Sequence, residues 1–356
     1  MTIKLYGVYK INFVFVYILD FVPPIQILEQ LFLNILHLMY NHFMKLVIQI
    51  PCFNEQDCVL EVLKSIPKNY LGIDEVEILV LDDASNDETF NIAKEYGVEV
   101  IKSSQKVGLA NIFKIGLKEA LNRGADILVN IDGDNQYDAN DIQKLINPVI
   151  NNEADIVIGA RPIDKIKTFS SFKKTLQKFG SFVIKSLTKI DVKDAASGYR
   201  AYSRNALLKL NIFNDFTYTI ESIIQAKYKN LSIKNVDINV NLQENRKSKL
   251  FKNNFDYIIM QAKNTVRFFI IYRPFKFFSI ISALLFLLGF VLGTRFLYFY
   301  LTNDGAGHIQ SLILCAIILT LSFVCFMLAI VGDLFSINRK ILEDIQFEIR
   351  QNKYKK

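Results

Sequence analysis

The sequence predicts an α/β domain with a mostly parallel sheet and helices on both faces, followed by two transmembrane helices. Apolar stretches of strand length alternate with stretches of helical spacing between about residues 44 and 271. Polar or acidic residues follow four of the strand-like stretches, and two long apolar runs come near the C-terminus. Strands that alternate with helices pair in parallel, so helices cover both faces of the predicted sheet.

The composition fits one medium domain with membrane additions. The chain has 356 residues and a formal net charge of +7, with Lys and Arg clustered beside the apolar runs and in the tail. This distribution is typical of the cytoplasmic face of a membrane protein. No nucleic-acid-binding motif accompanies the charge, so no nucleic-acid partner is expected. The four cysteines have neither metal-type nor disulfide spacing and are expected to be reduced.

Residues 1–43 leave two interpretations open. Ile11–Val22 is apolar but carries Asp20 and is shorter than the ~20 residues of a membrane span. Ile25–Met39 has the pattern of an apolar helix that lies on a membrane. Alternatively, the native chain starts at Met44, directly before the first strand.

The elements of the domain follow from the hydrophobic period. Strands are expected at Lys45–Ile50, Val76–Leu81, Val98–Lys102, Asp126–Ile131 and Asp155–Ile158. Helices are expected at Val59–Ile66, Thr89–Tyr96, Asn111–Asn122 and Asp138–Asn151. Gly97 and Gly124 are expected to end the second and third helices. Further on, Ser197–Arg200 is typical of a tight turn into a strand, and Tyr218–Lys227 of a helix.

The central stretch is Asp132-Gly133-Asp134, which ends the apolar strand at Asp126–Ile131. In an extended chain, residues i and i+2 share a face, so the two carboxylates can converge on one ion. Gly133 lets the backbone approach a ligand closely. Hard oxygen ligands suit Mg²⁺ or Mn²⁺. The alternative is an acidic turn that merely closes the strand.

Four polar groups follow strand ends, and in a parallel sheet these ends meet at the edge where ligands bind. They are Asn54 with Glu55, Asp82 with Asp83, Asp132 with Asp134, and Arg161. The first strand is not followed by a Gly-x-Gly-x-x-Gly motif, and no Walker-type motif occurs. The sequence therefore argues against dinucleotide-dependent dehydrogenases and P-loop enzymes.

Five motifs occur in a characteristic order. They are Pro-Cys-Phe-Asn-Glu at 51–55, Leu-Asp-Asp-Ala-Ser at 81–85, Asp-Gly-Asp-Asn-Gln at 132–136, Gly-Ala-Arg at 159–161 and Ser-Gly-Tyr-Arg at 197–200. Over about residues 44–250 the set resembles the family-2 glycosyltransferases. More narrowly, it resembles their polyprenyl-phosphate branch, typified by dolichol-phosphate mannose synthase. The resemblance implies a GT-A nucleotide-diphospho-sugar transferase domain, an inverting reaction, and Mg²⁺ or Mn²⁺ as cofactor.

The resemblance also implies roles for individual residues. Around the base and ribose of the donor it places Pro51, Phe53, Glu55, Leu81 and Asp83. At the donor diphosphate and its metal it places Asp132, Gly133, Asp134 and Gln136, with Asp132, Asp134 and Gln136 as metal ligands. At the acceptor phosphate it places Arg161, Lys173, Gln177 and Arg246. The catalytic set is thus Asp132, Asp134 and Arg161.

Some of these assignments stay open. Lys173 and Gln177 stand where the family has arginine and serine, and lysine holds phosphate only as a point charge. Glu221 is placed at the edge of the sugar pocket by the resemblance, and a surface glutamate is the alternative. Arg200 is either structural or close to phosphate.

The C-terminal third predicts a membrane region. Phe251–Phe269 has the pattern of an amphipathic helix on a membrane surface, with a core-packing helix as the alternative. Phe277–Thr294 and Ile309–Leu334 are long enough to span. Lys and Arg flank both spans and are absent from Thr302–His308, so a multi-pass protein with a cytoplasmic catalytic domain in the cell membrane is expected. The expected segments are 1–43 (extension), 44–250 (catalytic), 251–274 (juxtamembrane), 275–335 (transmembrane) and 336–356 (basic cytoplasmic tail).

The predicted function is sugar transfer from a nucleotide-diphospho-sugar to a polyprenyl phosphate, undecaprenyl or dolichyl, for the synthesis of cell-envelope glycans or glycoconjugates. A phosphomonoester, with its second pKa at about 6, is largely ionised at neutral pH and needs no general base. Transfer to a sugar acceptor is one alternative, which would need a base such as Glu221 or Asp215. A catalytically silent membrane scaffold of the same fold is the other.

Overall fold

The computed structural model describes most of the chain after Phe43. The described residues are 43–163, 180–213 apart from 183 and 187, 217–241, 263, 266–267, 269–303 and 309–355. The chain divides into two compact units, Met1–Phe43 and Met44–Lys356, and every element below belongs to the second. The apolar stretches expected before Met44, and most of the expected amphipathic helix, lie outside the described residues.

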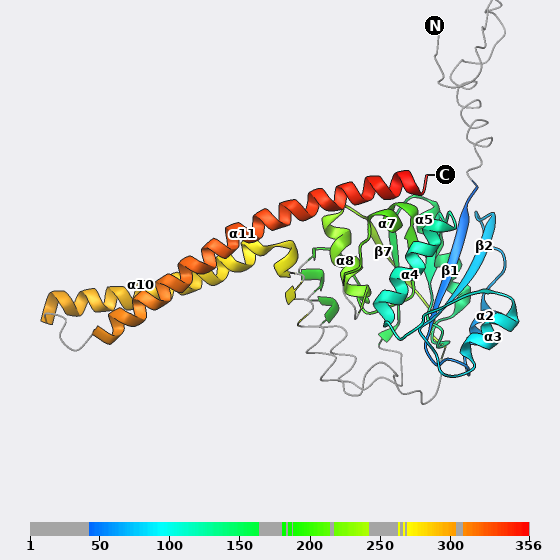
Figure 1. Ribbon diagram of the computed structural model, residues 1–356, viewed down its shortest axis with the longest axis horizontal. Helices are drawn as coiled ribbons and strands as arrows, with labels where there is room; N and C mark the ends of the chain where they lie inside the picture. Colours follow the sequence, from blue (N-terminus) through cyan, green and yellow to red (C-terminus); the bar gives the residue numbers. More distant parts are fainter. Residues whose placement is uncertain are drawn as a thin grey trace, which may run out of the picture. The chain divides into compact units, whose positions relative to one another are not determined.

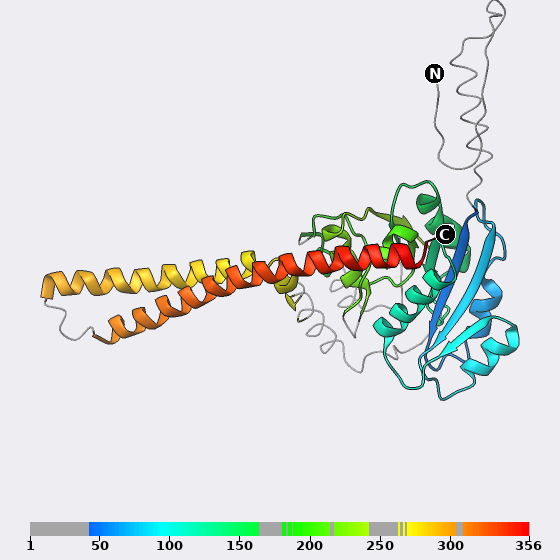
Figure 2. The same cartoon turned by 45° about the horizontal axis from the view of Figure 1, so that its top comes forward.

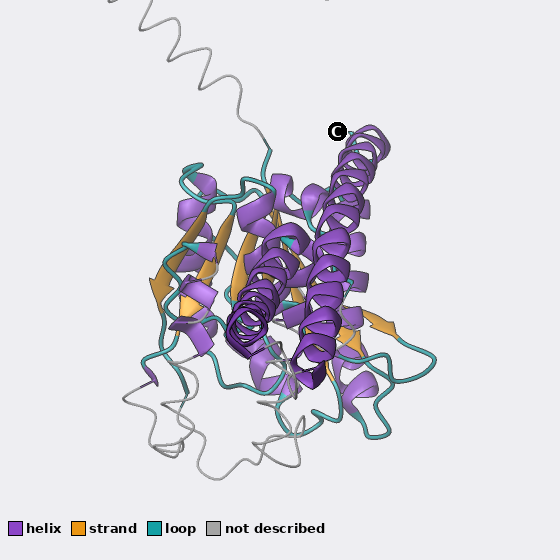
Figure 3. Ribbon diagram, turned by 90° about the vertical axis from the view of Figure 1, so that its left-hand side faces the viewer, coloured by secondary structure: helices purple, strands orange, loops and turns teal. Residues whose placement is uncertain are grey.

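A seven-stranded mixed sheet forms the centre of this unit (Figures 1 and 3). Its strands are β1 (Lys45–Cys52), β2 (Glu75–Asp82), β3 (Glu99–Lys102), β4 (Ile127–Asn130), β5 (Ile156–Ala160), β6 (Arg200–Ser203) and β7 (Ile233–Asp237). Their spatial order is β3-β2-β1-β4-β6-β5-β7. β6 runs antiparallel to both neighbours, and the other pairs are parallel. The predicted mostly parallel sheet is confirmed.

Helices cover the sheet, and their ends follow local chemistry. They are α2 (Val59–Ser65), α3 (Thr89–Tyr96), α4 (Leu109–Asn122), α5 (Ile142–Ile150), α7 (Arg204–Lys209) and α8 (Thr219–Tyr228). Gly97 ends α3 in the left-handed region at φ 90°, as predicted. α5 begins later than expected, because Asp138 caps a short 3₁₀ turn, Ala139–Asp141, by accepting from Asn140 N–H. Neither α7 nor β7 was predicted. β7 is largely polar and only partly buried, and α7, with six residues, is too short to show a helical period.

Side chains of the buried strands alternate between two cores, one on each face of the sheet. In β1, Leu46, Ile48 and Ile50 pack with α2, α3 and α5. Val47 faces the other way and packs with α4, α7 and α8. Gln49 is also fully buried on that second face, where an alanine at Gly116 would place its Cβ 1.9 Å from Gln49 Oε1. The alternation of side chains along β1 thus supplies residues to both cores and places the polar Gln49 in the second one.

Two long helices, α10 (Pro274–Asn303) and α11 (Ile309–Lys353), lie side by side (Figures 1 and 2). Both are long and apolar enough to cross a membrane, and their outer faces expose many Leu, Ile and Phe side chains. Small residues line the contact: Ser282 and Ser322 exchange hydroxyl-to-carbonyl hydrogen bonds of 2.9 Å. The two predicted apolar helices are confirmed, and α11 continues far beyond Leu334, the expected end of the second span.

Candidate active site

The loops after β1, β2, β4 and β5 lie at one edge of the sheet. β1 pairs in parallel with both β2 and β4. β5 points the same way as β4, because each is antiparallel to β6 between them. The polar groups that follow these strands in the sequence are therefore gathered at their carboxyl ends, as the alternating pattern indicated.

The first two of these loops are tied together by hydrogen bonds. Asn54 N–H donates to Ser85 Oγ at 2.9 Å, and Asn86 N–H donates to Asn54 Oδ1 at 2.9 Å. Glu55 N–H donates to Thr89 Oγ1 at 2.7 Å. Asn54 adopts φ 55°, a left-handed conformation that asparagine tolerates better than most residues. The segment that carries Glu55 is thereby held against the start of α3.

Two of the predicted donor-binding residues have clear structural contacts. Leu81 is fully buried in the core, and its contact with a donor stays a prediction. Asp83 is 5% exposed and accepts from Val107 N–H at 2.7 Å and Gly108 N–H at 2.9 Å. Asp83 thus fixes the loop before α4, and its contact with a donor stays a prediction.

Phe53 offers an aromatic face at this edge. The Nζ atom of Lys106 lies 3.4 Å from the centroid of the Phe53 ring, a cation–π contact. Phe53 is partly buried, whereas Lys106 is exposed. A flat ring beside a cation suits a nucleotide, whose base stacks on aromatic rings and whose phosphates attract ammonium groups.

The Asp132-Gly133-Asp134 segment crosses close over the end of β1. Gly133 N–H donates to Pro51 O at 3.3 Å. Gln136 N–H donates to Asp134 Oδ1 at 3.2 Å, which shapes the turn. Asp132 is partly buried. Burial and the neighbouring Asp134 carboxylate raise the pKa of Asp132 to about 7. Two carboxylates are therefore held close enough to repel each other.

This carboxylate pair fits a divalent ion bound together with a ligand. Among the described residues, no three His, Cys, Asp or Glu side chains form a group that could hold a metal. Mg²⁺ commonly takes one or two carboxylates and completes its octahedron with water and substrate phosphates. The mutual repulsion of Asp132 and Asp134 is relieved by a cation. The predicted metal residues are thus suited to a shared protein–substrate site rather than a closed one.

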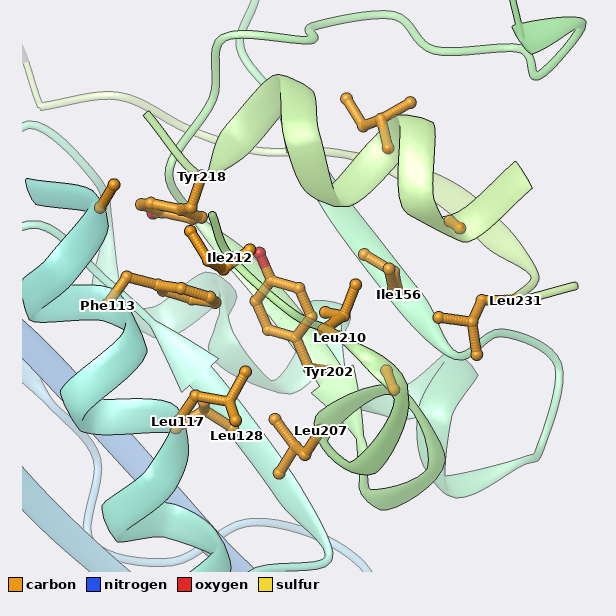
Figure 4. Packing of buried hydrophobic residues seen from close by; sticks show 14 of the residues in the cluster. Phe113, Leu117, Leu128, Ile156, Tyr202, Leu207, Leu210, Ile212, Tyr218 and Leu231 are labelled. Carbon is orange, nitrogen blue, oxygen red and sulfur yellow. The ribbon is translucent and has the colours of Figure 1, made fainter. Parts of the chain in front are cut away.

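A buried amide network stands behind Asp132. Gln49 Nε2 donates to Asn130 Oδ1 at 2.8 Å, and Asn130 Nδ2 lies 2.9 Å from both Gly198 O and Tyr218 Oη. Asn130 Nδ2 also reaches Asp132 Oδ1 at 3.5 Å. The Tyr218 ring stacks on Phe113 with centroids 3.9 Å apart (Figure 4). The sequence interpretation missed this network, although buried amides inside two apolar strands were a usable signal.

Arg161, predicted for the acceptor phosphate, forms a bidentate ion pair. Its Nε and Nη2 atoms donate to Asp194 Oδ2 and Oδ1 at 2.7 and 3.1 Å. The two side chains are 9% and 1% exposed, so water screens the pair little. Asp194 was missed by sequence reasoning, because it lies 33 residues from its partner. Asp194 holds the guanidinium plane in a fixed orientation. Arg161 lowers the pKa of Asp132, although burial raises that pKa by more.

The open alternatives for Arg200 and Glu221 can now be narrowed. Arg200 is fully buried and donates to the carbonyls of Ala195, Ser197 and Thr219 and to Ser222 Oγ. These contacts are structural and shape the loop that precedes β6. Glu221 is fully buried too, so the surface alternative is wrong. Its Oε1 accepts from Phe213 N–H at 3.0 Å and Gln225 Nε2 at 3.1 Å.

Three predicted acceptor residues, Lys173, Gln177 and Arg246, lie outside the described residues. Their roles stay predictions.

The close approach at Gly133 gives a stability prediction. An alanine there would place its Cβ 2.5 Å from Cys52 Sγ and 3.2 Å from Pro51 O. We expect Gly133→Ala to lower the free energy of unfolding by about 1–3 kcal/mol through overpacking. Cys52→Ala removes the obstructing sulfur, so the double variant should lose less than the two single losses combined. Thermal unfolding of all four proteins measures this coupling.

Gly180→Ala is a matched control, because no atom of the described residues lies within 4 Å of the added Cβ. Additive losses in the double variant would show that Gly133 does not pack on Cys52.

Comparisons with known proteins identify the family. A family model described as Glycosyl transferase family 2 matches residues 47–210. UDP-N-acetylglucosamine–dolichyl-phosphate N-acetylglucosaminyltransferase of Methanococcus voltae is 32% identical over 213 residues, which cover 53% of this chain and 82% of that protein. Dolichol-phosphate mannosyltransferase of Pyrococcus furiosus is 33% identical over 195 residues, which cover 52% of this chain and 54% of that protein.

A solved structure of glucosyl-3-phosphoglycerate synthase from Mycobacterium tuberculosis, with Mn²⁺ and UDP-glucose, is also similar. It aligns over 64% of this chain and 78% of its own, with 19% identity and a TM-score of 0.49.

The family model and the mixed α/β sheet together place the chain among the glycosyltransferases. The chain belongs to glycosyl transferase family 2. The names of its relatives confirm the resemblance to the polyprenyl-phosphate branch of that family, and the expected GT-A domain followed by two apolar helices is confirmed.

Proposed function

We propose that this protein transfers a sugar from a nucleotide-diphospho-sugar to a polyprenyl phosphate and inverts the anomeric carbon. The observation that carries the proposal is the charge arrangement at Asp132. The neighbouring Asp134 carboxylate raises the pKa of Asp132, and the Arg161 guanidinium lowers it. One place at the sheet edge thus offers both a carboxylate pair for a metal–diphosphate and an arginine for a second anion. The named relatives supply the substrate classes.

The chemistry assigns each residue a task. Mg²⁺ or Mn²⁺ at Asp132 and Asp134, with Gln136 as a further candidate ligand, would stabilise the charge that develops on the leaving diphosphate. Asn130 orients the Asp132 carboxylate, and Asp194 orients Arg161 toward the acceptor phosphate. An acceptor phosphate oxygen attacks the anomeric carbon as the bond to the donor diphosphate breaks, and the nucleoside diphosphate leaves with the electron pair. The ionised nucleophile has no proton to remove.

The membrane arrangement follows from the same proposal. We place α10 and α11 across the cell membrane, and the catalytic domain on its cytoplasmic side. Arg273 and Lys276 precede the first span and Arg339 and Lys340 follow the second, which supports this orientation. A lipid acceptor then reaches Arg161 from the membrane surface.

A panel assay tests the function. Membranes that contain the protein are incubated with Mg²⁺, a series of radiolabelled nucleotide sugars, and either undecaprenyl or dolichyl phosphate. Label that enters the lipid fraction from at least one donor is the expected result. Label that enters a free sugar acceptor and never the lipid would support the sugar-acceptor alternative. Nucleotide-sugar binding without any transfer would indicate a silent scaffold.

A further inference from the structure

α11 does not end where its apolar run ends. Beyond Leu334 its residues are largely charged or polar, yet the helix continues unbroken to Lys353. At 1.5 Å per residue, the 18 residues from Ser336 to Lys353 extend about 27 Å past the apolar run. Figures 1 and 2 show this part running over the catalytic domain.

One face of this extension is covered. From Phe335 to Lys355 every described residue is exposed except six. They are Ser336, Arg339, Glu343, Phe347, Arg350 and Tyr354. Steps of three and four residues place all six on one side of a helix.

Near the apolar run, the covered face contacts α8 and the segment before α10. The Arg339 guanidinium lies 4.0 Å from the centroid of the Tyr272 ring, which stacks on Tyr228 at 4.6 Å. Glu343 accepts from Arg339 at 2.8 Å and lies 3.5 Å from Lys229 Nζ. Lys229 and Glu343 are only 8% and 13% exposed, so these contacts are not loose surface pairs.

Near its end, the covered face contacts α7. Arg350 Nη1 donates to Leu208 O at 3.1 Å and to Leu210 O at 2.8 Å. The last carbonyls of a helix lack partners within it and carry partial negative charge, so an arginine stabilises them. Arg204, at the start of α7, donates to Tyr354 O. Arg339 and Arg350, two of the basic residues of the expected tail, are therefore engaged with the domain.

Both contacted helices lead to the site. α7 directly follows β6, whose Arg200 holds the loop that contains Ala195 and Ser197. α8 begins after Tyr218, whose hydroxyl meets Asn130 behind the carboxylate pair. The α11 extension thus contacts two elements that lead to the candidate site, one toward the Arg161 side and one toward the carboxylate pair.

We propose that residues 336–354 act as a strut that holds the catalytic domain in one orientation on the membrane, with Arg350 and Glu343 as positioning residues for a membrane-embedded acceptor. This rests on the proposed function. Loss of the strut leaves donor binding intact but lets the site swing relative to the lipid phosphate. The rate of transfer to an embedded acceptor then falls, because fewer encounters have the productive geometry.

Two acceptors test the strut on the full-length protein. One is undecaprenyl phosphate in vesicles, and the other is a short, water-soluble isoprenyl phosphate. We expect Arg350→Ala to reduce transfer to the vesicle acceptor by about tenfold, with transfer to the soluble acceptor unchanged. Glu343→Gln should show the same split more weakly, and Arg350→Lys should restore part of the loss. Hydrogen exchange at the end of α7 should accelerate in Arg350→Ala.

Gln351→Ala, an exposed neighbour of Arg350, is the matched control and should change nothing. If Arg350→Ala slows both acceptors equally, or neither, the strut proposal is wrong while the proposed function stands. A wild-type protein that uses neither acceptor would instead refute the proposed function.

Discussion

Asp134→Asn is expected to reduce sugar transfer by on the order of a thousandfold, because one neutral amide replaces half of the carboxylate pair. The substitution keeps the side-chain shape, and an amide oxygen can still accept from Gln136 N–H. The fold should therefore survive. The negative charge that would hold the metal ion and the donor diphosphate is lost. Mn²⁺-dependent binding of a nucleoside diphosphate should therefore weaken together with turnover.

Calorimetric titration and thermal unfolding separate these effects. Asp74→Asn is a suitable control, since Asp74 accepts from Met44 N–H at the opposite edge of the sheet. A variant Asp134→Asn that turns over normally at ordinary Mg²⁺ would contradict the assignment of the carboxylate pair.

Arg161→Lys should weaken use of the polyprenyl phosphate by about ten- to a hundredfold while the affinity for the nucleotide sugar stays the same. Lysine keeps the charge, so the buried Asp194 carboxylate retains a cationic partner. Lysine cannot, however, hold Asp194 in the bidentate geometry and present further N–H groups to a second anion. The loss should appear in the concentration dependence on acceptor, measured at saturating donor.

Arg123→Lys is the matched control, because Arg123 is also ion-paired, to Glu77 and Glu99, but at the opposite edge of the sheet. An equal loss of donor and acceptor affinity in Arg161→Lys would assign Arg161 to the donor diphosphate instead.

The regular part of the fold could be predicted because its signals are local. The predicted parallel strands are short apolar runs, and each predicted helix shows its period within one stretch of chain. Asp132 and Asp134 could be recognised for the same reason, since two carboxylates directly after a buried strand already specify an edge position. β7, a parallel strand that is largely polar, was missed. The antiparallel direction of β6 is not a local property, because it depends on the path of the chain between β5 and β6.

Contacts between residues far apart in the chain could not be predicted from the sequence. Asp194 meets Arg161 across 33 residues, and Asn130 meets Tyr218 across 88. No local pattern encodes such pairs. The extension of α11 is a different case, since Arg339, Glu343, Phe347 and Arg350 recur at helical spacing. That signal was present, but the net positive charge suggested a basic tail.

The identity of the product tests the central proposal most directly. Purified protein in vesicles is given a nucleotide sugar and polyprenyl phosphate, and the lipid and nucleotide products are analysed by mass spectrometry. We expect the sugar joined to the lipid through a single phosphate, with one nucleoside diphosphate released per transfer. Release of a nucleoside monophosphate with a diphosphate-linked sugar lipid, or a sugar on a free hydroxyl group, would contradict it.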